Sequence, residues 1–290
     1  ADKIQRITQE LDVMGIVGNG SSISTLNEAG IENTDVFIAV TSSDELNLLC
    51  CMFAKKVGHC HAVARVRNPD YSRELDFIKQ QLGISTIINP ELASAREIAR
   101  LLSFPAASKI DTFAQGKVRL IKFQLHDIQC LDKVPLKDIP DRIGCDVLVC
   151  AVERGHDVII PGGDFTLESG DIVTVLATPE RAAKFFGKMN LPTRPVHSAL
   201  IVGGGTVGYY LAKELIAHGI RVRIVEQNEE KCGKLAEALP EATILHGDGT
   251  DRQLLMSEGL PISESIVALT NIDEENILIS LFAKSHSNAK

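Results

Sequence analysis

The sequence has no tryptophan and only 4% aromatic residues, so it has few side chains that stack on bases or sugar rings. It also lacks a basic excess: 30 Lys and Arg stand against 38 Asp and Glu, a formal net charge of −8, which argues against a surface built for phosphate backbones. Its uncharged apolar runs are of strand length, far short of the roughly 18 residues of a membrane helix. We therefore expect neither a nucleic-acid partner nor a membrane span.

The cysteines also give no sign of a disulfide framework. The seven cysteines are odd in number and have no framework spacing, which favours reduced thiols in a cytosol. The N-terminus shows no basic stretch followed by an apolar one, so no secretory signal is visible. A length of 290 residues, 44% of them hydrophobic, indicates two domains or three small ones in an intracellular globular protein.

One segment of the chain occurs twice. Residues 18–55 align without a gap onto 247–284, and 13 of the 38 pairs are identical, including Gly18/Gly247, Thr41/Thr270 and Asn47/Asn276. Two copies are too few for a solenoid, so the pattern indicates a duplicated domain. The first copy lacks the front part that the second shows, and the second lacks the back part that the first shows. We expect the chain to represent part of a longer protein.

Strand and helix patterns alternate within both copies. The second copy has strands at 199–202, 221–226, 243–245 and 266–269, with helices over 206–218, 229–238 and 253–257 between them. The first copy shows strands at 62–66 and 86–88 and helices over 70–81 and 90–102. This alternation predicts an α/β protein with Rossmann-like doubly wound parallel sheets, duplicated and each incomplete in this chain.

The segment between the copies has a different character. Residues 118–125, 146–153, 157–160 and 171–176 have β patterns, and a helix is expected over 178–189. We predict a small α+β domain at 108–193, between Rossmann-like domains at 1–107 and 194–290.

A glycine-rich turn follows the first strand of the second copy, with the sequence Gly203-Gly204-Gly205-Thr206-Val207-Gly208. Its Gly-x-Gly-x-x-Gly spacing permits a tight turn, close approach of a pyrophosphate and close packing of the next helix. Glu226 ends the second strand, where a carboxylate accepts hydrogen bonds from ribose hydroxyls and repels a 2′-phosphate. The pattern predicts an NAD(H) site; the alternative is a glycine turn that binds nothing.

Polar residues follow the other strands at the same edge. We expect Asp248 to accept from an adenine amino group, with Asn19 at the equivalent place in the first copy. Thr270 and Asn271, matched by Thr41 and Ser42, are either site residues or ordinary strand-end turns and helix caps. Asp44 and Asp273 are interpreted as caps because each precedes a helix pattern.

Several other groups have two interpretations each. Arg65 and Arg67 share one side of a strand, where one of them is able to clamp a phosphate or both form surface salt bridges. His59 and His61 share a strand face but lack further ligands nearby, which favours a packing or surface role over metal binding. His126, His156 and His197 have no evident carboxylate partner in the sequence, so no catalytic dyad is visible.

Taken together, these motifs resemble the TrkA-like nucleotide-binding subunits of the bacterial Trk potassium-uptake system, built from Rossmann-like and small C-terminal RCK domains. The resemblance covers essentially the whole chain, and the residues that carry it are Ile201 to Gly205, Val40 to Asn47 with its partner Leu269 to Asn276, and Ala64 to Tyr71.

The resemblance implies a cytosolic regulatory subunit, peripheral on the inner membrane, that forms a ring under a Trk-type potassium-conducting membrane subunit. It also implies binding of NAD(H), or of ATP and ADP, in the Rossmann clefts. Carried over residue by residue, the nucleotide contacts are Gly203, Gly204, Gly205, Thr206, Val207, Gly208, Glu226, Asp248, Thr270 and Asn271 in the second copy, and Thr41, Ser42 and Arg65 in the first.

Our sequence hypothesis is therefore a non-enzymatic regulator that gates potassium transport through a nucleotide-driven conformational change. Two alternatives stay open at this point. One is an NAD-dependent oxidoreductase, and the other is a regulator of a glutathione-gated potassium efflux system, whose Rossmann domain is similar.

Overall fold

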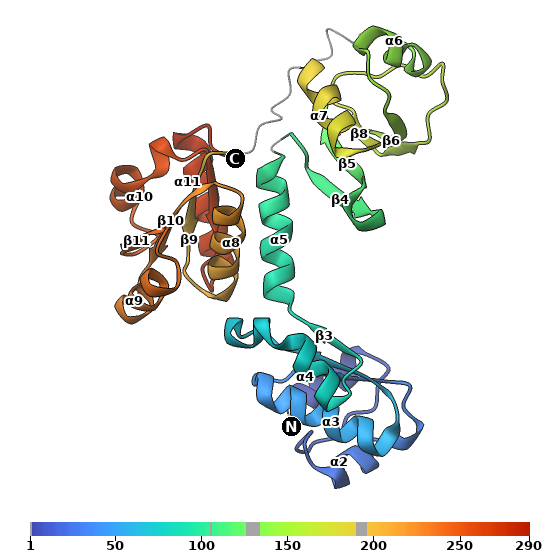
Figure 1. The fold of residues 1–290 in the computed structure, drawn as a ribbon, viewed down its shortest axis with the longest axis vertical. Helices are drawn as coiled ribbons and strands as arrows, with labels where there is room; N and C mark the ends of the chain where they lie inside the picture. Colours follow the sequence, from blue (N-terminus) through green and yellow to red (C-terminus); the bar gives the residue numbers. More distant parts are fainter. Residues whose placement is uncertain (1, 105, 126–133, 190–195) are drawn as a thin grey trace. The chain divides into compact units, whose positions relative to one another are not determined.

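Residues 2–104, 106–125, 134–189 and 196–290 are described in a computed structural model of the chain (Figure 1). The chain divides into two compact units, Ala1–Ser94 and Ala95–Lys290. The division falls inside one helix, α5, so the expected boundary of the first domain at residue 107 stays a prediction.

The first unit contains a three-stranded parallel sheet in the order β1-β2-β3. Its elements are α1 (Asp2–Glu10), α2 (Ile23–Glu28), β1 (Val36–Ala39), α3 (Asp44–Gly58), β2 (His61–Arg65), a 3-10 helix η2 (Pro69–Arg73), α4 (Leu75–Leu82), β3 (Thr86–Ile88) and the start of α5 (Pro90–Ser103). The small side chains of Cys51, Ala62 and Ala64 are fully buried where α3 packs on the sheet. Cys51 thus acts as a small hydrophobe, and burial raises the pKa of its thiol to about 12.

The helix cap of α3 differs from the expectation. Ser43 is the N-cap, since its hydroxyl accepts from the backbone N–H of Leu46. The Oδ2 atom of Asp44 instead accepts from the backbone N–H groups of Arg67 and Asn68, at 2.8 Å each. The capping prediction was therefore wrong for Asp44: this buried carboxylate ties the start of α3 to the loop after β2. Asp273 is likewise the first residue of its helix and not the cap.

The helix predicted over 70–81 was wrong in its first part. A 3-10 helix occupies Pro69–Arg73, and α4 starts only at Leu75. Asn68 caps the short helix by accepting from the backbone N–H of Asp70. Glu74, with φ −113° and ψ 5°, separates the two segments.

The second unit contains the second copy, a four-stranded parallel sheet in the order β11-β10-β9-β12. Its elements are β9 (Ser198–Val202), α8 (Thr206–Ala217), β10 (Arg221–Glu226), α9 (Glu229–Ala238), β11 (Thr243–His246), α10 (Arg252–Glu258), β12 (Ser265–Ala268) and α11 (Asp273–His286). Because β10 and β12 lie on opposite sides of β9, the strand order reverses there. A crevice is expected at the carboxyl ends of the strands around such a switch point.

The second unit also contains the α+β domain, an antiparallel sheet in the order β4-β5-β8-β6-β7. Its elements are β4 (Lys109–Phe113), β5 (Val118–Gln124), α6 (Ile139–Ile143), β6 (Leu148–Arg154), β7 (Asp157–Ile159), β8 (Ile172–Ala177) and α7 (Pro179–Lys188). Phe123, Phe185 and Phe186 form the centre of its core. The sequence predicted neither β4 nor α6. Helix α6 has only five residues, too few for a helical period to repeat.

No helix in the described part of the chain combines the length and apolar character required to cross a membrane.

Candidate functional site

The glycine loop of the second copy joins β9 to α8 in a conformation that depends on its glycines. Gly203 has φ +113°, and a Cβ there would overlap the carbonyl oxygen of Leu269. A Cβ on Gly208 would overlap the carbonyl oxygen of Gly203, so Gly208 lets α8 pack against the loop. Gly205, the N-cap of α8, faces open space, and it leaves the first N–H groups of the helix without a covering side chain. This is the arrangement that holds a phosphate at a helix N-terminus.

Glu226 is tied to this loop. Its Oε2 accepts from the backbone N–H of Gly204 at 3.0 Å, and its Oε1 accepts from the backbone N–H of Asn228 at 2.9 Å. A carboxylate has about four acceptor positions, so two hydrogen bonds leave capacity for ribose hydroxyls. The residue predicted to bind ribose therefore also fixes the loop predicted to bind phosphate.

Asp248 organises the turn after β11. Its Oδ1 accepts from both the backbone N–H and the hydroxyl of Thr250, at 2.8 Å each. These hydrogen bonds lower the pKa of Asp248, so its carboxylate is charged at neutral pH. The first copy repeats this turn, because Oδ1 of Asn19 accepts from the N–H and hydroxyl of Ser21 at 3.0 and 2.8 Å.

Thr270 is held at the end of β12 by Asn276. The amide oxygen of Asn276 accepts from the backbone N–H of Thr270 at 2.7 Å, and its Nδ2 donates to the carbonyl of Thr270 at 3.1 Å. Asn47 makes the same pair of hydrogen bonds to Thr41 in the first copy, at 2.7 and 3.3 Å. We call each arrangement an asparagine clasp. The clasp was not predicted from the sequence, although the identity of Asn47 and Asn276 in the repeat was a signal.

These elements enclose a cavity of about 220 Å³ at the carboxyl edge of the second sheet. Of the predicted residues, it is lined by Gly203, Gly205, Glu226, Asp248, Thr270 and Asn271. Gly204, Thr206, Val207 and Gly208 belong to the loop and helix start but do not line it. Loops and helices beside the cavity also bring to it residues that the sequence did not predict: Gln227, Lys231, Gly249, Thr250, Ile272 and Glu275.

The predicted residues of the first copy lie in the other unit. The Nη2 atom of Arg65 donates to the carbonyl of Thr41 at 2.8 Å, and Nη2 of Arg67 donates to the carbonyl of Ser42 at 2.7 Å. Arg67 also lies 3.6 Å from Asp44 and 3.8 Å from Glu91 in salt bridges. Both guanidinium groups therefore reach the loop after β1. Arg67 lies beyond the end of β2, so the two arginines do not share one strand, and it pairs with the buried Asp44 and the partly buried Glu91 and not on a solvated face.

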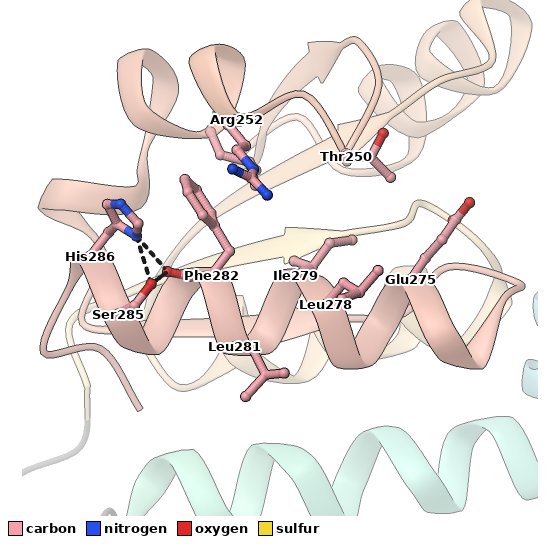
Figure 2. Close-up of a pocket in the computed structure, with 11 residues that line it drawn as sticks. Thr250, Arg252, Glu275, Leu278, Ile279, Leu281, Phe282, Ser285 and His286 are labelled. Atoms are coloured by element: carbon pink, nitrogen blue, oxygen red, sulfur yellow. Dashed lines mark hydrogen bonds between the residues drawn. The ribbon is translucent and has the colours of Figure 1, made fainter.

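A second, more apolar groove of about 420 Å³ lies between α10 and α11 (Figure 2). Leu278, Ile279 and Phe282 project from α11 on the side that faces α10, where Arg252 lies over the ring of Phe282, 5.3 Å from its centre. The groove adjoins the glycine-loop cavity, since Gly249, Thr250 and Glu275 line both.

None of the histidines in the described part of the chain lines the glycine-loop cavity. His197 has a carboxylate partner that the sequence did not reveal: its backbone N–H donates to Glu264 at 2.8 Å, and its ring lies 3.2 Å from the same carboxylate. This exposed pair precedes β9 and β12, so it lies at the amino ends of the strands, opposite the cavity. His59 ends α3 in a left-handed conformation, so it does not share a strand face with His61. His126 lies outside the described residues.

The sequence matches known families over most of its length. A family model described as the TrkA-N domain matches residues 1–90 and 199–290, and a model described as the TrkA-C domain matches residues 131–190. These two matches confirm the duplicated Rossmann-like domain and the small domain between its copies.

Curated relatives extend this match. The chain is 36% identical over 284 residues to a protein named Trk system potassium uptake protein TrkA homolog from Archaeoglobus fulgidus, covering 98% of this chain and 64% of the relative. It is 37% identical to a TrkA homolog 1 from Methanosarcina mazei, covering 95% of this chain and 69% of the relative. The chain thus spans about two thirds of the length of these relatives.

A solved structure supports the fold. The structure described as the GsuK channel bound to NAD aligns with a TM-score of 0.67 at 16% identity, covering 98% of this chain and 50% of that chain. At this low identity the likeness shows a shared fold.

Proposed function

This chain belongs to the TrkA family, and from that premise we propose that it is the nucleotide-binding part of a regulatory subunit of a potassium-transport system. In this proposal it binds NAD(H), or ATP and ADP, and changes the state of a potassium-conducting membrane partner. It acts in the cytoplasm, peripherally on the inner membrane, as part of a ring of copies. Its role is regulatory and not catalytic.

The cavity at the carboxyl edge of the second sheet carries this proposal. There the uncapped start of α8, the carboxylate of Glu226 and the turn of Asp248 surround one space. The start of α8 suits a pyrophosphate, Glu226 suits a ribose, and the turn of Asp248 suits an adenine. The GsuK channel, which has the same fold, was solved with NAD bound.

Regulation requires that the nucleotide bind one conformation of the assembly more tightly than the other, because a ligand with equal affinity for both shifts nothing. In the first copy, Thr41, Ser42 and Arg65 are our proposed contacts of the equivalent site. Both copies hold the strand-end loop with the same asparagine clasp, which supports a related use.

Isothermal titration of NADH, NAD, ATP and ADP into the chain tests the nucleotide site. We expect saturable binding of at least one of them and at least tenfold weaker binding by Glu226→Ala, since hydrogen bonds to a charged group contribute about 1.5–3 kcal/mol. Glu237→Ala is the matched control, because Glu237 is an exposed glutamate on α9 outside the cavity. It should bind like the unmodified chain.

Two results would contradict the proposal. One is the absence of saturable binding by a chain with an unchanged circular dichroism spectrum. The other is NADH oxidation with a carbonyl substrate that Glu226→Ala abolishes, which would make the protein an oxidoreductase. If the chain does bind nucleotide, potassium flux in vesicles that contain the membrane partner, measured with and without nucleotide, tests the regulatory step.

A further inference from the structure

Arg67 lies in a cluster of charges at the carboxyl edge of the first sheet. Its Nη2 atom donates to the carbonyl of Ser42 at 2.7 Å. Its Nε atom lies 3.6 Å from Oδ1 of Asp44, and its Nη1 atom lies 3.8 Å from Oε1 of Glu91. One guanidinium therefore connects three elements: the loop after β1, the start of α3 and the first turn of α5.

The two carboxylates are held to different degrees. Asp44 keeps a second attachment, because its Oδ2 accepts from the backbone N–H groups of Arg67 and Asn68 at 2.8 Å each. Glu91 is held less well, since 3.8 Å is longer than a hydrogen bond and its buried Oε2 accepts no hydrogen bond from the described residues. A buried oxygen without a donor is costly, so the contact with Glu91 is the one that a competing anion displaces most easily.

A nucleotide phosphate at the loop after β1 is such a competitor. Thr41 and Ser42 on this loop are proposed nucleotide contacts, and the guanidinium of Arg67 already reaches the carbonyl of Ser42. Arg65 brings a second guanidinium to the same loop, where its Nη2 donates to the carbonyl of Thr41 at 2.8 Å. Hydrogen bonds from a guanidinium to a phosphate are short and charge-assisted, so they are stronger than the 3.8 Å ion pair with Glu91.

We propose that Arg67 is a positioning residue that exchanges Glu91 for a nucleotide phosphate, so that ligand binding at the loop after β1 releases the start of α5. Helix α5 (Pro90–Ser103) continues past Ser94, where the two compact units divide, so the release occurs at the connection between the units. The inference rests on the proposed function and specifies how the first copy would transmit ligand binding. By linkage, weakening the contact with Glu91 strengthens nucleotide binding by the same factor.

This competition predicts opposite effects of two substitutions on nucleotide affinity. ATP and NADH are titrated into a Glu226→Ala chain, in which the site of the second copy is weakened. Adding Arg67→Gln should weaken the remaining binding several-fold. Adding Glu91→Gln should tighten it about two- to fivefold, the factor that a partly exposed ion pair contributes. Glu32→Gln is the matched control, because Glu32 is an exposed glutamate of the first unit, and it should leave the affinity unchanged.

Hydrogen exchange of residues 90–97 measures the release of α5. In the Glu226→Ala chain we expect saturating ATP to raise the exchange rate of this segment several-fold. Adding Glu91→Gln should give fast exchange without nucleotide and no further rise with it. A purely structural salt bridge would give fast exchange in this variant but no gain in nucleotide affinity, so the two measurements together separate the roles.

Equal or weaker nucleotide binding by the Glu91→Gln variant overturns the inference, and so does exchange of residues 90–97 that ignores the nucleotide. Absence of binding in the Glu226→Ala chain also overturns it, yet leaves the proposed function intact if the unmodified chain binds. Absence of binding in both contradicts the proposed function as well. Should Glu91→Gln lose its circular dichroism spectrum, Glu91→Asp replaces it, because its shorter side chain draws the carboxylate away from Arg67 and predicts the same changes.

Discussion

At the scale of single residues, the glycines of the β9–α8 loop have separable roles. Gly203 needs its positive φ and has no space for a Cβ, whereas Gly205 has an ordinary φ of −68° and open space around it. The sequence pattern predicted both as members of one motif. It did not distinguish the residue that shapes the loop from the one that faces the cavity, because that difference depends on the distant carbonyl of Leu269.

Substitution of these two glycines should therefore have different effects. We expect Gly203→Ala to lower the free energy of unfolding by about 1–3 kcal/mol, because alanine is strained there and clashes with backbone. Gly205→Ala should change it by less than about 0.5 kcal/mol while weakening nucleotide binding, since its methyl group points into the ligand space. Urea denaturation measures the first effect and titration the second. Equal destabilisation by both variants would show that the two positions are not distinct.

At the scale of secondary-structure elements, the hairpin of β6 and β7 is tied to β8 by one buried carboxylate. Both oxygens of Asp171 accept from the guanidinium of Arg154 at 2.8 Å, and Arg154 also donates to Glu168 at 2.7 Å. These hydrogen bonds lower the pKa of Asp171, which is 1% exposed. The sequence predicted the strands but not this link, since nothing in the periodicity pairs an arginine with an aspartate 17 residues later.

Asp171 should give the domain an acid-sensitive stability. A carboxyl group whose pKa is lower in the folded state stabilises the fold above its ordinary pKa of 3.8. This contribution is lost as the pH falls below that value through the lowered, folded-state pKa. Asp171→Asn removes the charge and leaves Arg154 without its partner, so we expect about 3 kcal/mol less stability at pH 7 and a flatter acid limb. Thermal unfolding between pH 2 and 7 measures both, and an unchanged acid limb would contradict this role.

At the scale of the whole molecule, the alternation of strand and helix patterns predicted the parallel sheets, most strand positions and the sheet edge where polar residues follow the strands. It succeeded because alternation and glycine spacing are local signals. The lining residues Lys231 and Glu275 were missed because their helices meet the cavity only after folding. Asp44 was misassigned as a cap because its partners, the N–H groups of Arg67 and Asn68, lie more than 20 residues away.

The division into two compact units predicts two unfolding transitions. Asn47→Ala and Asn276→Ala remove equivalent clasps from different units, so each should lower a different transition. We expect losses of about 1–3 kcal/mol, because the backbone groups of Thr41 or Thr270 lose their partners. Differential scanning calorimetry measures both variants, and each variant is the control for the other because it should leave the other unit's transition unchanged. A single transition that both variants lower equally would mean that the units unfold together.

The hydrogen bonds of Glu226, Asp248 and Asn276 have a common consequence for ligand entry. Each of these side chains already accepts a hydrogen bond from a backbone N–H group at the edge of the cavity, so the entropy cost of ordering it is met on folding and not on ligand binding. A preorganised cavity of this kind loses little side-chain freedom on binding. Under the proposed function, the interaction energy of a bound nucleotide would then be available to favour one arrangement of the assembly over another.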